Sequence, residues 1–215
     1  MLNGKKKQLA LSSAILLAPM VFGLAVWNRL PQTMVTHWGI DGTPNGWSSR
    51  GFVVFVLPLI MLAIHWIALL FSAKDLRNRG QDPKVLQLVL WITPAVSVFA
   101  FGCTYVAALG AEFNIGALAS VVVGVLFIAV GNYLPKCRQN YAIGIRVKWT
   151  LKSEENWNAT HRMAGRLWVV GGVLAVLCAF LPMHWMSRVF FCVVILLSVI
   201  PIVYSWQYHK KMEQQ

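Results

Sequence analysis

Six apolar stretches, each about the length needed to cross a lipid bilayer, restrict the fold of this chain more than any other feature. They cover residues 9–28, 52–73, 85–108, 113–133, 167–183 and 189–207. A transmembrane helix needs about 20 mostly apolar residues. Hydrophobic residues make up 58% of the chain and charged residues 12%, which is more apolar surface than a soluble domain can bury. We therefore predict an all-α integral membrane protein with six transmembrane helices, in a single polytopic domain over residues 1–215.

The first stretch also has the form of a signal peptide, because it follows Lys5, Lys6 and Lys7. Its apolar run is long for a signal core, however, and no clear pair of small residues closes it as a cleavage site. We expect this stretch to remain in the protein as the first membrane anchor.

The distribution of basic residues predicts which side of the membrane each loop occupies. Of the 19 Lys and Arg residues, only Arg29, Arg50 and Arg188 fall in the odd-numbered connections between the stretches. The others fall at the termini and in the even-numbered connections, at positions 5–7, 74, 77, 79, 84, 136, 138, 146, 148, 152, 162, 166, 210 and 211. Cytoplasmic loops carry the excess of Lys and Arg in membrane proteins. The pattern therefore predicts cytoplasmic N- and C-termini, one long outer loop at 29–51 and one long inner loop at 134–166.

The formal net charge of +12 has the same origin. The basic residues follow the ends of the spans, where anionic lipid headgroups attract them. They do not form the compact patch that is typical of a nucleic-acid-binding protein. We expect membrane lipids as partners and no direct contact with nucleic acid.

The outer loop contains the sequence THWGIDGTPNGW, which supplies the first set of candidate residues. Asp-Gly and Pro-Asn-Gly are strong turn formers, and indole rings suit the headgroup layer of a membrane. The loop is therefore either a folded cap on the outer membrane surface or a recognition surface for a ligand from outside. His37 and Asp41 can meet across the turns, but two ligands do not make a metal site. The candidate residues are His37, Trp38, Asp41, Gly42, Asn45, Gly46 and Trp47.

The inner loop ends in SEENWNATHR, a dense polar segment immediately before the fifth apolar stretch. Ser153 is a good N-cap, and Glu154 and Glu155 in the first turn complement the helix dipole. We therefore predict a helix that begins at Ser153 in the cytoplasm and continues into the bilayer. On such a helix Glu154, Asn158 and His161 share one side.

Three interpretations of this polar segment remain open. It is a solvated first turn with local ion pairs, or it is a clasp or binding surface that joins the 136–152 loop to the helix bundle. As a third option it transfers protons, with Glu154 or Glu155 as the base and His161 as the acid. No nucleophile motif, phosphate-binding loop or set of metal ligands accompanies these residues. We therefore predict no enzymatic activity, no cofactor and no bound metal.

Small residues recur every four positions in two of the apolar stretches, at Gly116, Ser120 and Gly124 and at Gly171, Ala175 and Ala179. Such stripes let helix backbones approach closely in lipid. We expect both faces to be helix contacts, and the two stripes can pair with each other.

His65 is the ionisable residue that lies deep within a predicted span. A histidine at that depth either joins a proton pathway or stays neutral and hydrogen-bonds a neighbouring helix. The sequence places no second acid or base at a similar depth, and we leave both interpretations open.

Both long loops resemble the signatures of a known family. LPQTMVTHWGIDGTPNGW is similar to the outer-loop signature of a domain of uncharacterised function that accompanies the SdpI family of bacterial membrane immunity proteins. YLPKCRQNYAIGIRVKWTLKSEENWNATHRMAGRLW resembles the signature of the SdpI family itself. Two places depart from the pattern: Val147-Lys148 stands where Thr-Pro is usual, and Gly39 stands where Asn is frequent. The inner candidate residues, which match the pattern, are Asn140, Gly144, Arg146, Trp149, Thr150, Glu155, Asn156, Trp157, Thr160 and His161.

Within the inner motif, Arg146 and Glu155 carry opposite charges. We expect them to form an ion pair that holds the loop against the fifth helix. Loss of either partner would leave the other charge unpaired. The substitutions Arg146→Ala and Glu155→Ala should then each impair function, and the double variant should be little worse than either.

The resemblance implies a multi-pass protein of the bacterial cytoplasmic membrane that gives resistance to a secreted antimicrobial peptide toxin. It also implies that the protein binds the toxin at its outer face. It further implies that the protein acts as a signalling receptor, which holds a cytosolic transcriptional autorepressor at its inner face. Two other functions stay open. A small-solute or peptide transporter or channel needs polar residues along its spans, and these are sparse here. A membrane-embedded enzyme would act at the cytoplasmic face.

Overall fold

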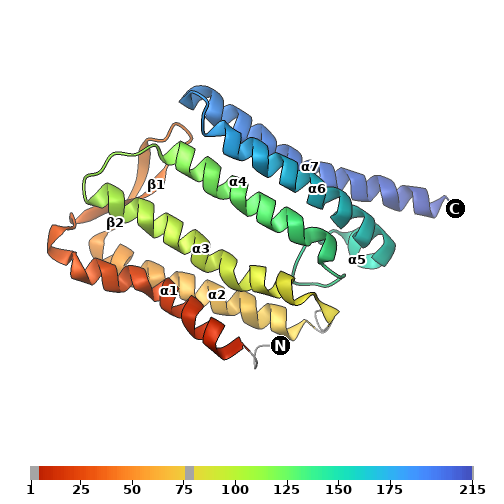
Figure 1. Ribbon diagram of the computed structural model, residues 1–215, viewed down its shortest axis with the longest axis horizontal. Helices are drawn as coiled ribbons and strands as arrows, with labels where there is room; N and C mark the ends of the chain where they lie inside the picture. Colours follow the sequence, from red (N-terminus) through yellow and green to blue (C-terminus); the bar gives the residue numbers. More distant parts are fainter. Residues whose placement is uncertain (1–4, 76–79, 215) are drawn as a thin grey trace. The chain divides into compact units, whose positions relative to one another are not determined.

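The computed structural model describes residues 5–75 and 80–214 (Figure 1). The long helices are α1 (Lys6–Ala25), α2 (Leu57–Lys74), α3 (Pro83–Ala108), α4 (Ile115–Tyr133), α6 (Glu154–Cys178) and α7 (Met183–Glu213). The shorter elements are the 3-10 helices η2 (Trp27–Arg29) and η5 (Leu134–Lys136), the π-helix η3 (Phe52–Val56), the helix α5 (Lys148–Lys152), and the strands β1 (Thr33–Trp38) and β2 (Pro44–Ser49). Arg77 and Arg79, counted above among the inner-side cations, lie outside the described residues.

The prediction of a helical membrane protein with six spans is confirmed. Six helices in the described part of the chain are long and apolar enough to cross a bilayer. The predicted helix start at Ser153 is confirmed as well, because its hydroxyl accepts a hydrogen bond from the N–H of Asn156 at 3.1 Å. The fifth span ends earlier than predicted: α6 stops at Cys178, and α7 begins after Pro182. The side of the membrane on which each loop and terminus lies stays a prediction.

Contacts within the chain define two compact units, the first within residues 1–70 and 89–118 and the second within residues 71–88 and 119–215. The core of the first unit joins residues from its hairpin and from the helices around it. Its buried members are Leu30, Met34, Val53, Val54, Phe101 and Tyr105. The hydroxyl of Tyr105 donates to the carbonyl oxygen of Pro19 at 2.7 Å, which ties α3 to α1.

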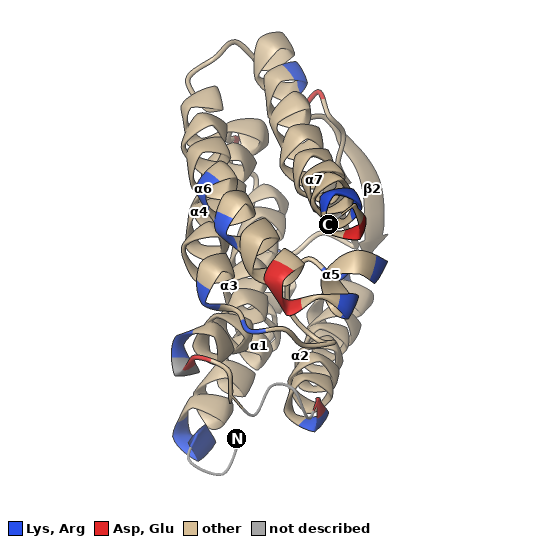
Figure 2. Cartoon of the chain, turned by 90° about the vertical axis from the view of Figure 1, so that its right-hand side faces the viewer, with Lys and Arg blue, Asp and Glu red and all other residues tan. Residues whose placement is uncertain are grey.

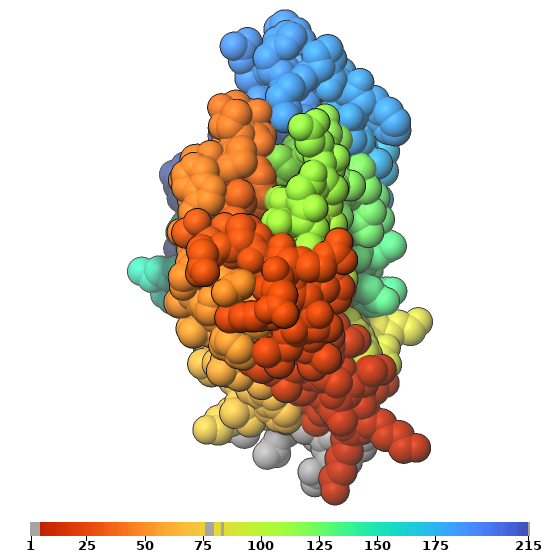
Figure 3. Space-filling model, turned by 90° about the vertical axis from the view of Figure 1, so that its left-hand side faces the viewer, coloured from red at the N-terminus to blue at the C-terminus, as the bar shows by residue number. Residues whose placement is uncertain are grey.

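The outer loop forms an antiparallel β-hairpin in the first unit, where the sequence indicated turns but not strands. Met34 on β1 is buried in the core, so one face of the hairpin is held against the helices. Arg50 follows β2 and donates hydrogen bonds to the carbonyl oxygens of Trp27 and Leu30 at 2.9 and 3.1 Å. These contacts fix both ends of the hairpin to the rest of the unit. In Figure 3 the N-terminal part of the chain, red to orange, forms a continuous surface.

His65 of α2 is fully buried and contacts α1. Its Nε2 atom lies 3.0 Å from the hydroxyl of Ser12, which itself donates to the carbonyl oxygen of Leu9 at 3.0 Å. Because that hydroxyl proton is already used, the simplest arrangement has the histidine donate from Nε2. The contact favours the interpretation of His65 as a neutral residue that joins two helices.

In the second unit, α6 packs against both α4 and α7 through small residues. A Cβ atom on Gly124 would lie 2.6 Å from the carbonyl oxygen of Gly172, so the α4 and α6 backbones are in close contact. A Cβ atom on Gly171 would lie 2.6 Å from the side chain of Leu197 on α7. Both predicted small-residue faces are therefore helix contacts. They do not pair with each other, because the stripe of Gly171 faces α7.

Candidate functional site

The inner candidate residues converge on the N-terminal part of α6, in the second unit. Seven of them form what we call the buried polar cluster: Asn140, Gly144, Thr150, Asn156, Trp157, Thr160 and His161. The six members other than Gly144 have buried side chains, and His161 is only 1% exposed. Buried polar groups require hydrogen-bond partners, because an unpaired one costs about 1–3 kcal/mol. The partners found here show what the cluster does.

His161 bonds to both α6 and the inner loop. Its Nδ1 atom lies 2.8 Å from the carbonyl oxygen of Trp157, and its Nε2 atom accepts the N–H of Ile145 at 3.0 Å. A carbonyl only accepts and a backbone N–H only donates, so the ring is neutral and carries its proton on Nδ1. The Trp157 ring stacks on the imidazole, with centroids 4.0 Å apart and an interplanar angle of 19°. Both ring nitrogens are used within the chain, which speaks against His161 as a proton donor to a substrate.

Gly144 allows the inner loop to approach these two rings. Its φ of +102° lies in the left-handed region that residues with a side chain avoid. A Cβ atom at this position would also lie 2.5 Å from Nε2 of His161 and 3.1 Å from the Trp157 ring. Glycine is therefore required here for two independent reasons.

Asn140 holds the inner loop in a turn by bonding to the backbone around it. Its side-chain oxygen accepts the N–H groups of Ala142 and Ile143 at 2.8 and 2.7 Å. Its side-chain nitrogen donates to the carbonyl oxygen of Arg138 at 2.7 Å. This is the local bonding that makes asparagine a strong turn residue.

Thr150 and Trp157 attach the same loop to the helices. The hydroxyl of Thr150 donates to the carbonyl oxygen of Ile145 at 2.8 Å and accepts the N–H of Val147 at 3.1 Å, which orders the start of α5. The indole of Trp157 donates to the carbonyl oxygen of Cys137 at 2.7 Å. The bonds of Thr150 thus join the end of the loop to α5, and the bond of Trp157 joins the start of the loop to α6, 20 positions away in sequence.

Asn156 and Trp149 extend the network to α7 through Ser205. The side-chain nitrogen of Asn156 donates to the carbonyl oxygen of Ser205 at 2.9 Å, and its oxygen accepts the hydroxyl of Thr160 at 3.0 Å. The indole of Trp149 donates to the hydroxyl of Ser205, and its ring stacks on His209. Ser205 was not predicted from the sequence, because a single serine in an apolar helix forms no pattern.

The buried face of α6 differs from the predicted one. Asn156, Trp157 and His161 point inward, whereas Glu154 and Asn158, which we expected beside His161, are exposed. The prediction placed these residues on one side by their spacing along the helix. Spacing does not show which side the inner loop and α7 cover, and the residues buried there include polar ones.

The predicted ion pair between Arg146 and Glu155 is wrong. Arg146 donates to the carbonyl oxygen of Tyr141 at 2.6 Å, and Glu155 accepts the hydroxyl of Tyr208 at 2.6 Å. Both residues are exposed, so water solvates their charges and neither requires a buried counterion. We therefore no longer expect the effects of Arg146→Ala and Glu155→Ala on function to be non-additive.

Gln81, ahead of α3, is a second residue that the sequence analysis missed. Its side-chain nitrogen donates to the carbonyl oxygen of Arg138 at 2.6 Å, and its oxygen accepts the N–H of Arg138 at 3.0 Å. Nearby, Asp75 accepts the N–H of Tyr141. These residues precede the inner loop by more than 50 positions, and no local pattern marks them as its partners.

The chemistry available in the cluster is structural. Burial raises the pKa of the Cys137 thiol to about 11, against the opposing effect of its contact with Asn140. The thiol is therefore protonated at neutral pH and is a poor nucleophile. Within residues 5–75 and 80–214, no group of three His, Cys, Asp or Glu side chains is placed to hold a metal ion. The geometry matches the clasp among the three interpretations of the polar segment.

The outer candidates lie on the hairpin of the first unit, where bonds are short-range. The Nδ1 atom of His37 lies 2.5 Å from the side-chain oxygen of Asn45. The predicted approach of His37 to Asp41 is wrong, because Asp41 accepts the hydroxyl and the N–H of Thr43 at 2.8 and 3.1 Å. These two bonds, the hydroxyl first, lower the pKa of the Asp41 carboxyl. The hairpin tip is thus a locally bonded turn, in which Gly42 takes a φ of +76°.

The same hairpin exposes apolar side chains. Ile40 is 62% exposed and Trp47 is 58% exposed. Trp38 is half-buried, and its ring lies edge-on to Phe113 with centroids 6.4 Å apart. Gly46 lets the strands approach, because a Cβ atom there would lie 2.9 Å from Cβ of His37. Ile40 was not among the predicted residues, because a single exposed apolar residue in a loop carries no signal in the sequence.

Comparison with known proteins gives matches for both regions. Residues 136–205 match the SdpI/YfhL protein family, and residues 14–62 match a domain of unknown function, DUF1648. The chain is 25% identical to "Immunity protein SdpI" of Bacillus subtilis (strain 168) over 207 residues, which cover 96% of this chain and 98% of that protein. No solved structure matches the chain.

Proposed function

We propose that this chain, whose residues 136–205 match the SdpI/YfhL protein family, is a membrane immunity protein that protects a bacterial cell from a secreted peptide toxin. The observation that carries the proposal is the similarity to Immunity protein SdpI along 96% of the chain, which includes both long loops. The six helices of membrane-spanning length agree with it. The neutral and fully bonded His161 also agrees with binding rather than catalysis as the mode of action.

We assign toxin contact to the hairpin at 33–49. An antimicrobial peptide that acts on membranes presents an apolar face, and Ile40 and Trp47 offer exposed apolar area that matches it. The hairpin is tied to its unit by Met34 and Arg50, so these side chains lose little conformational freedom on binding. Tryptophan residues such as Trp47 are among those that dominate the binding energy of many interfaces.

We assign contact with a cytosolic repressor to the exposed surface of α5 and the first turns of α6. Lys148, Lys152, Glu154 and Asn158 are exposed there, and the buried polar cluster beneath them holds both helices in place. Signalling from toxin to repressor would require two arrangements of the protein with different affinities for each partner.

The test is rescue of toxin-sensitive bacteria that express the chain, with binding of the labelled toxin to the purified protein as a second measurement. We expect rescue by the unmodified chain and loss of rescue in the double variant Ile40→Ser, Trp47→Ala at equal expression. Rescue that survives the double variant would remove the hairpin from the proposal. Failure of the unmodified chain to rescue from any peptide would remove the immunity function.

Topology is tested by labelling with a membrane-impermeant maleimide in cells that carry Ile40→Cys or Asn158→Cys, both at exposed positions, in a Cys192→Ser background. The other cysteines, Cys103, Cys137 and Cys178, are buried. We expect reaction at position 40 and none at position 158 until the cells are permeabilised. The reverse result would place the hairpin in the cytoplasm and exclude toxin contact there.

A further inference from the structure

We propose that the groove between α6 and α7 binds the phosphate headgroup of an anionic phospholipid. The groove has a volume of about 580 Å³ and is lined by Arg162, Met163, Arg166, Leu167, Tyr204 and Tyr208. It lies within the second unit, apart from the contacts that hold the buried polar cluster together. Neither the proposed immunity function nor the comparisons assign a ligand to it.

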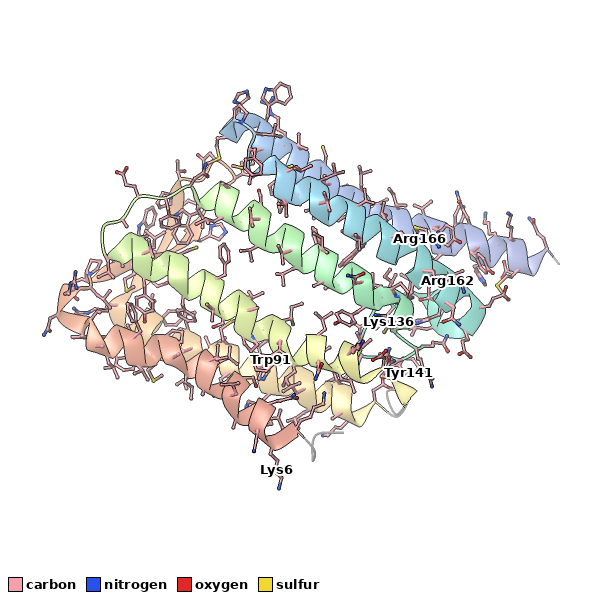
Figure 4. All side chains as sticks on the ribbon, in the orientation of Figure 1. Lys6, Trp91, Lys136, Tyr141, Arg162 and Arg166 are labelled. Carbon is pink, nitrogen blue, oxygen red and sulfur yellow. The ribbon has the colours of Figure 1, made fainter. Side chains whose placement is uncertain are left out.

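Two arginines of the groove are free to bind an anion. Arg162 and Arg166 lie one turn apart on the exposed side of α6 (Figure 4). Neither forms an ion pair or a hydrogen bond with another residue that the structure describes. A guanidinium group presents several N–H donors in a planar fork that matches the oxygen atoms of a phosphate. Two such groups at one-turn spacing can hold a single phosphate from two sides.

The position of the arginines along α6 points to a lipid. Arg166 is followed by Leu167 and then by apolar and small residues, and no further charged residue appears before Arg188. The two arginines therefore lie at the polar end of the apolar run of α6, from which long basic side chains reach the headgroup layer. Met163 and Leu167 give the groove an apolar floor next to the two charges. A phospholipid offers the same combination, a phosphate joined to apolar chains.

The opposite wall of the groove comes from α7 and is aromatic. Tyr204 and Tyr208 lie one turn apart, with ring centroids 6.2 Å from each other. The hydroxyl of Tyr208 donates to Glu155, so that carboxylate sits at the rim and its charge opposes an anion there. Tyr204 makes no such bond with a residue that the structure describes, and its hydroxyl is available to a headgroup. Tyrosine is enriched at this level of the membrane because its ring is apolar and its hydroxyl is polar.

Further positive charge surrounds the groove. A neighbouring hollow on α7 shares Tyr204 and Tyr208 and is lined by Lys210 and Lys211. Figure 2 shows Lys and Arg both on α6 and at the C-terminal end of α7. Basic pockets between transmembrane helices on the cytoplasmic side are the usual places for anionic headgroups. Glu155 opposes this charge at Tyr208, and Glu213 on α7 pairs with His209. The four basic residues outnumber these two carboxylates, which favours phosphatidylglycerol over a zwitterionic lipid.

The experiment measures phospholipid retained by the purified, detergent-solubilised protein, with phosphatidylglycerol, phosphatidylcholine and inorganic phosphate as separate probes. Native mass spectrometry reports the bound lipid, and the shift in thermal unfolding reports its effect on the protein. We expect retention of phosphatidylglycerol and a higher unfolding temperature with it, and neither effect with phosphatidylcholine or inorganic phosphate. In the double variant R162Q/R166Q we expect affinity for phosphatidylglycerol to fall by about tenfold or more, since each basic residue near an anionic surface contributes about 1 kcal/mol.

Matched variants separate the groove from charge in general. K148Q/K152Q removes two exposed cations at the same one-turn spacing on α5, and we expect it to bind like the unmodified protein. R162K/R166K keeps the charge, and we expect partial retention of binding, which also guards against a folding defect in the glutamine variant. Equal losses in the α5 control, unchanged binding in R162Q/R166Q, or equal stabilisation by inorganic phosphate would each overturn the proposal.

Discussion

The outer hairpin and the buried polar cluster carry motifs of similar density, but they use them in opposite ways. On the hairpin, His37, Asn45 and Asp41 bond to neighbours within a few residues, and Ile40 and Trp47 face outward. In the cluster, His161 and Asn156 bond to segments far away in sequence, and almost nothing is exposed. A motif whose side chains are buried serves folding first, whereas one whose side chains are exposed is available to a partner. The comparison predicts large stability effects in the cluster and small ones on the hairpin.

The largest expected effect is at Gly144. Gly144→Ala places a Cβ atom 2.5 Å from Nε2 of His161 in a left-handed backbone, and we expect it to destabilise the protein by about 3–4 kcal/mol. Gly110→Ala is the matched control, because Gly110 has a φ of +87° and nothing within 4 Å of the added atom. We expect that variant to lose only about 1 kcal/mol. Unfolding by increasing fractions of SDS in mixed micelles measures both, and equal losses would show that the clash with His161 is absent.

A pair of histidine variants compares the two regions directly. His161→Ala removes a stacked ring and leaves the N–H of Ile145 without its acceptor, so we expect a loss of about 2–3 kcal/mol. His37→Ala removes an exposed contact with Asn45, and we expect a change below about 0.5 kcal/mol. The same SDS titration applies. Similar losses at both positions would contradict the division into a folding motif and a contact motif.

Two asparagines on α6 sharpen the assignment of its buried face. Asn156→Ala removes the bond to Ser205 on α7 and leaves that carbonyl oxygen buried, which we expect to cost about 1–2 kcal/mol. Asn158→Ala lies half a turn away on the exposed side and should change stability by less than about 0.3 kcal/mol. Thermal unfolding followed by circular dichroism measures both variants. A larger loss at position 158 would mean that α6 is rotated from the orientation described above.

At Trp47 the expected change in stability is small, whereas the expected change in function is large. Trp47→Ala removes a side chain that is 58% exposed, so unfolding should move by less than about 0.5 kcal/mol. Under the proposed function, protection from the toxin should fall by at least tenfold in the toxin concentration tolerated. Trp149→Ala is the control for a structural tryptophan, because the indole of Trp149 donates a hydrogen bond to Ser205. We expect this variant to lose protection because the protein is less stable. Full protection by Trp47→Ala would count against toxin contact at this strand.

Much of this arrangement was predictable from the sequence. The six spans follow from runs of apolar residues, and the start of α6 follows from a serine ahead of two glutamates. Both signals are local, since they depend on how a residue interacts with solvent, lipid or the next turn of its own helix. The hairpin was only partly predictable, because its turns carry Gly and Asn, whereas its short strands lack an apolar alternation.

The inward face of α6 and the partners of its residues were not predictable in this way. Asn158 and His161 look alike as polar residues on a helix, and only the packing of the inner loop and α7 shows that one is solvated and the other buried. The ion pair between Arg146 and Glu155 failed for the same reason, since each charge found a nearer neutral partner.

The sequence by itself determined that this protein belongs in a membrane, how many times it can cross, and where its fifth long helix begins. The transfer of an apolar segment into lipid and the capping of a helix both depend on residues that are close in sequence, so the sequence alone shows them. Only the tertiary structure decided that Gln81 and Asp75 bond to the inner loop and that Ser205 bonds to the buried polar cluster. It also decided that Arg162 and Arg166 lie beside a groove and form no ion pair with another described residue. Hydrogen bonds between distant segments depend on which helices pack together, and that choice is made by close contacts such as Gly124 with Gly172.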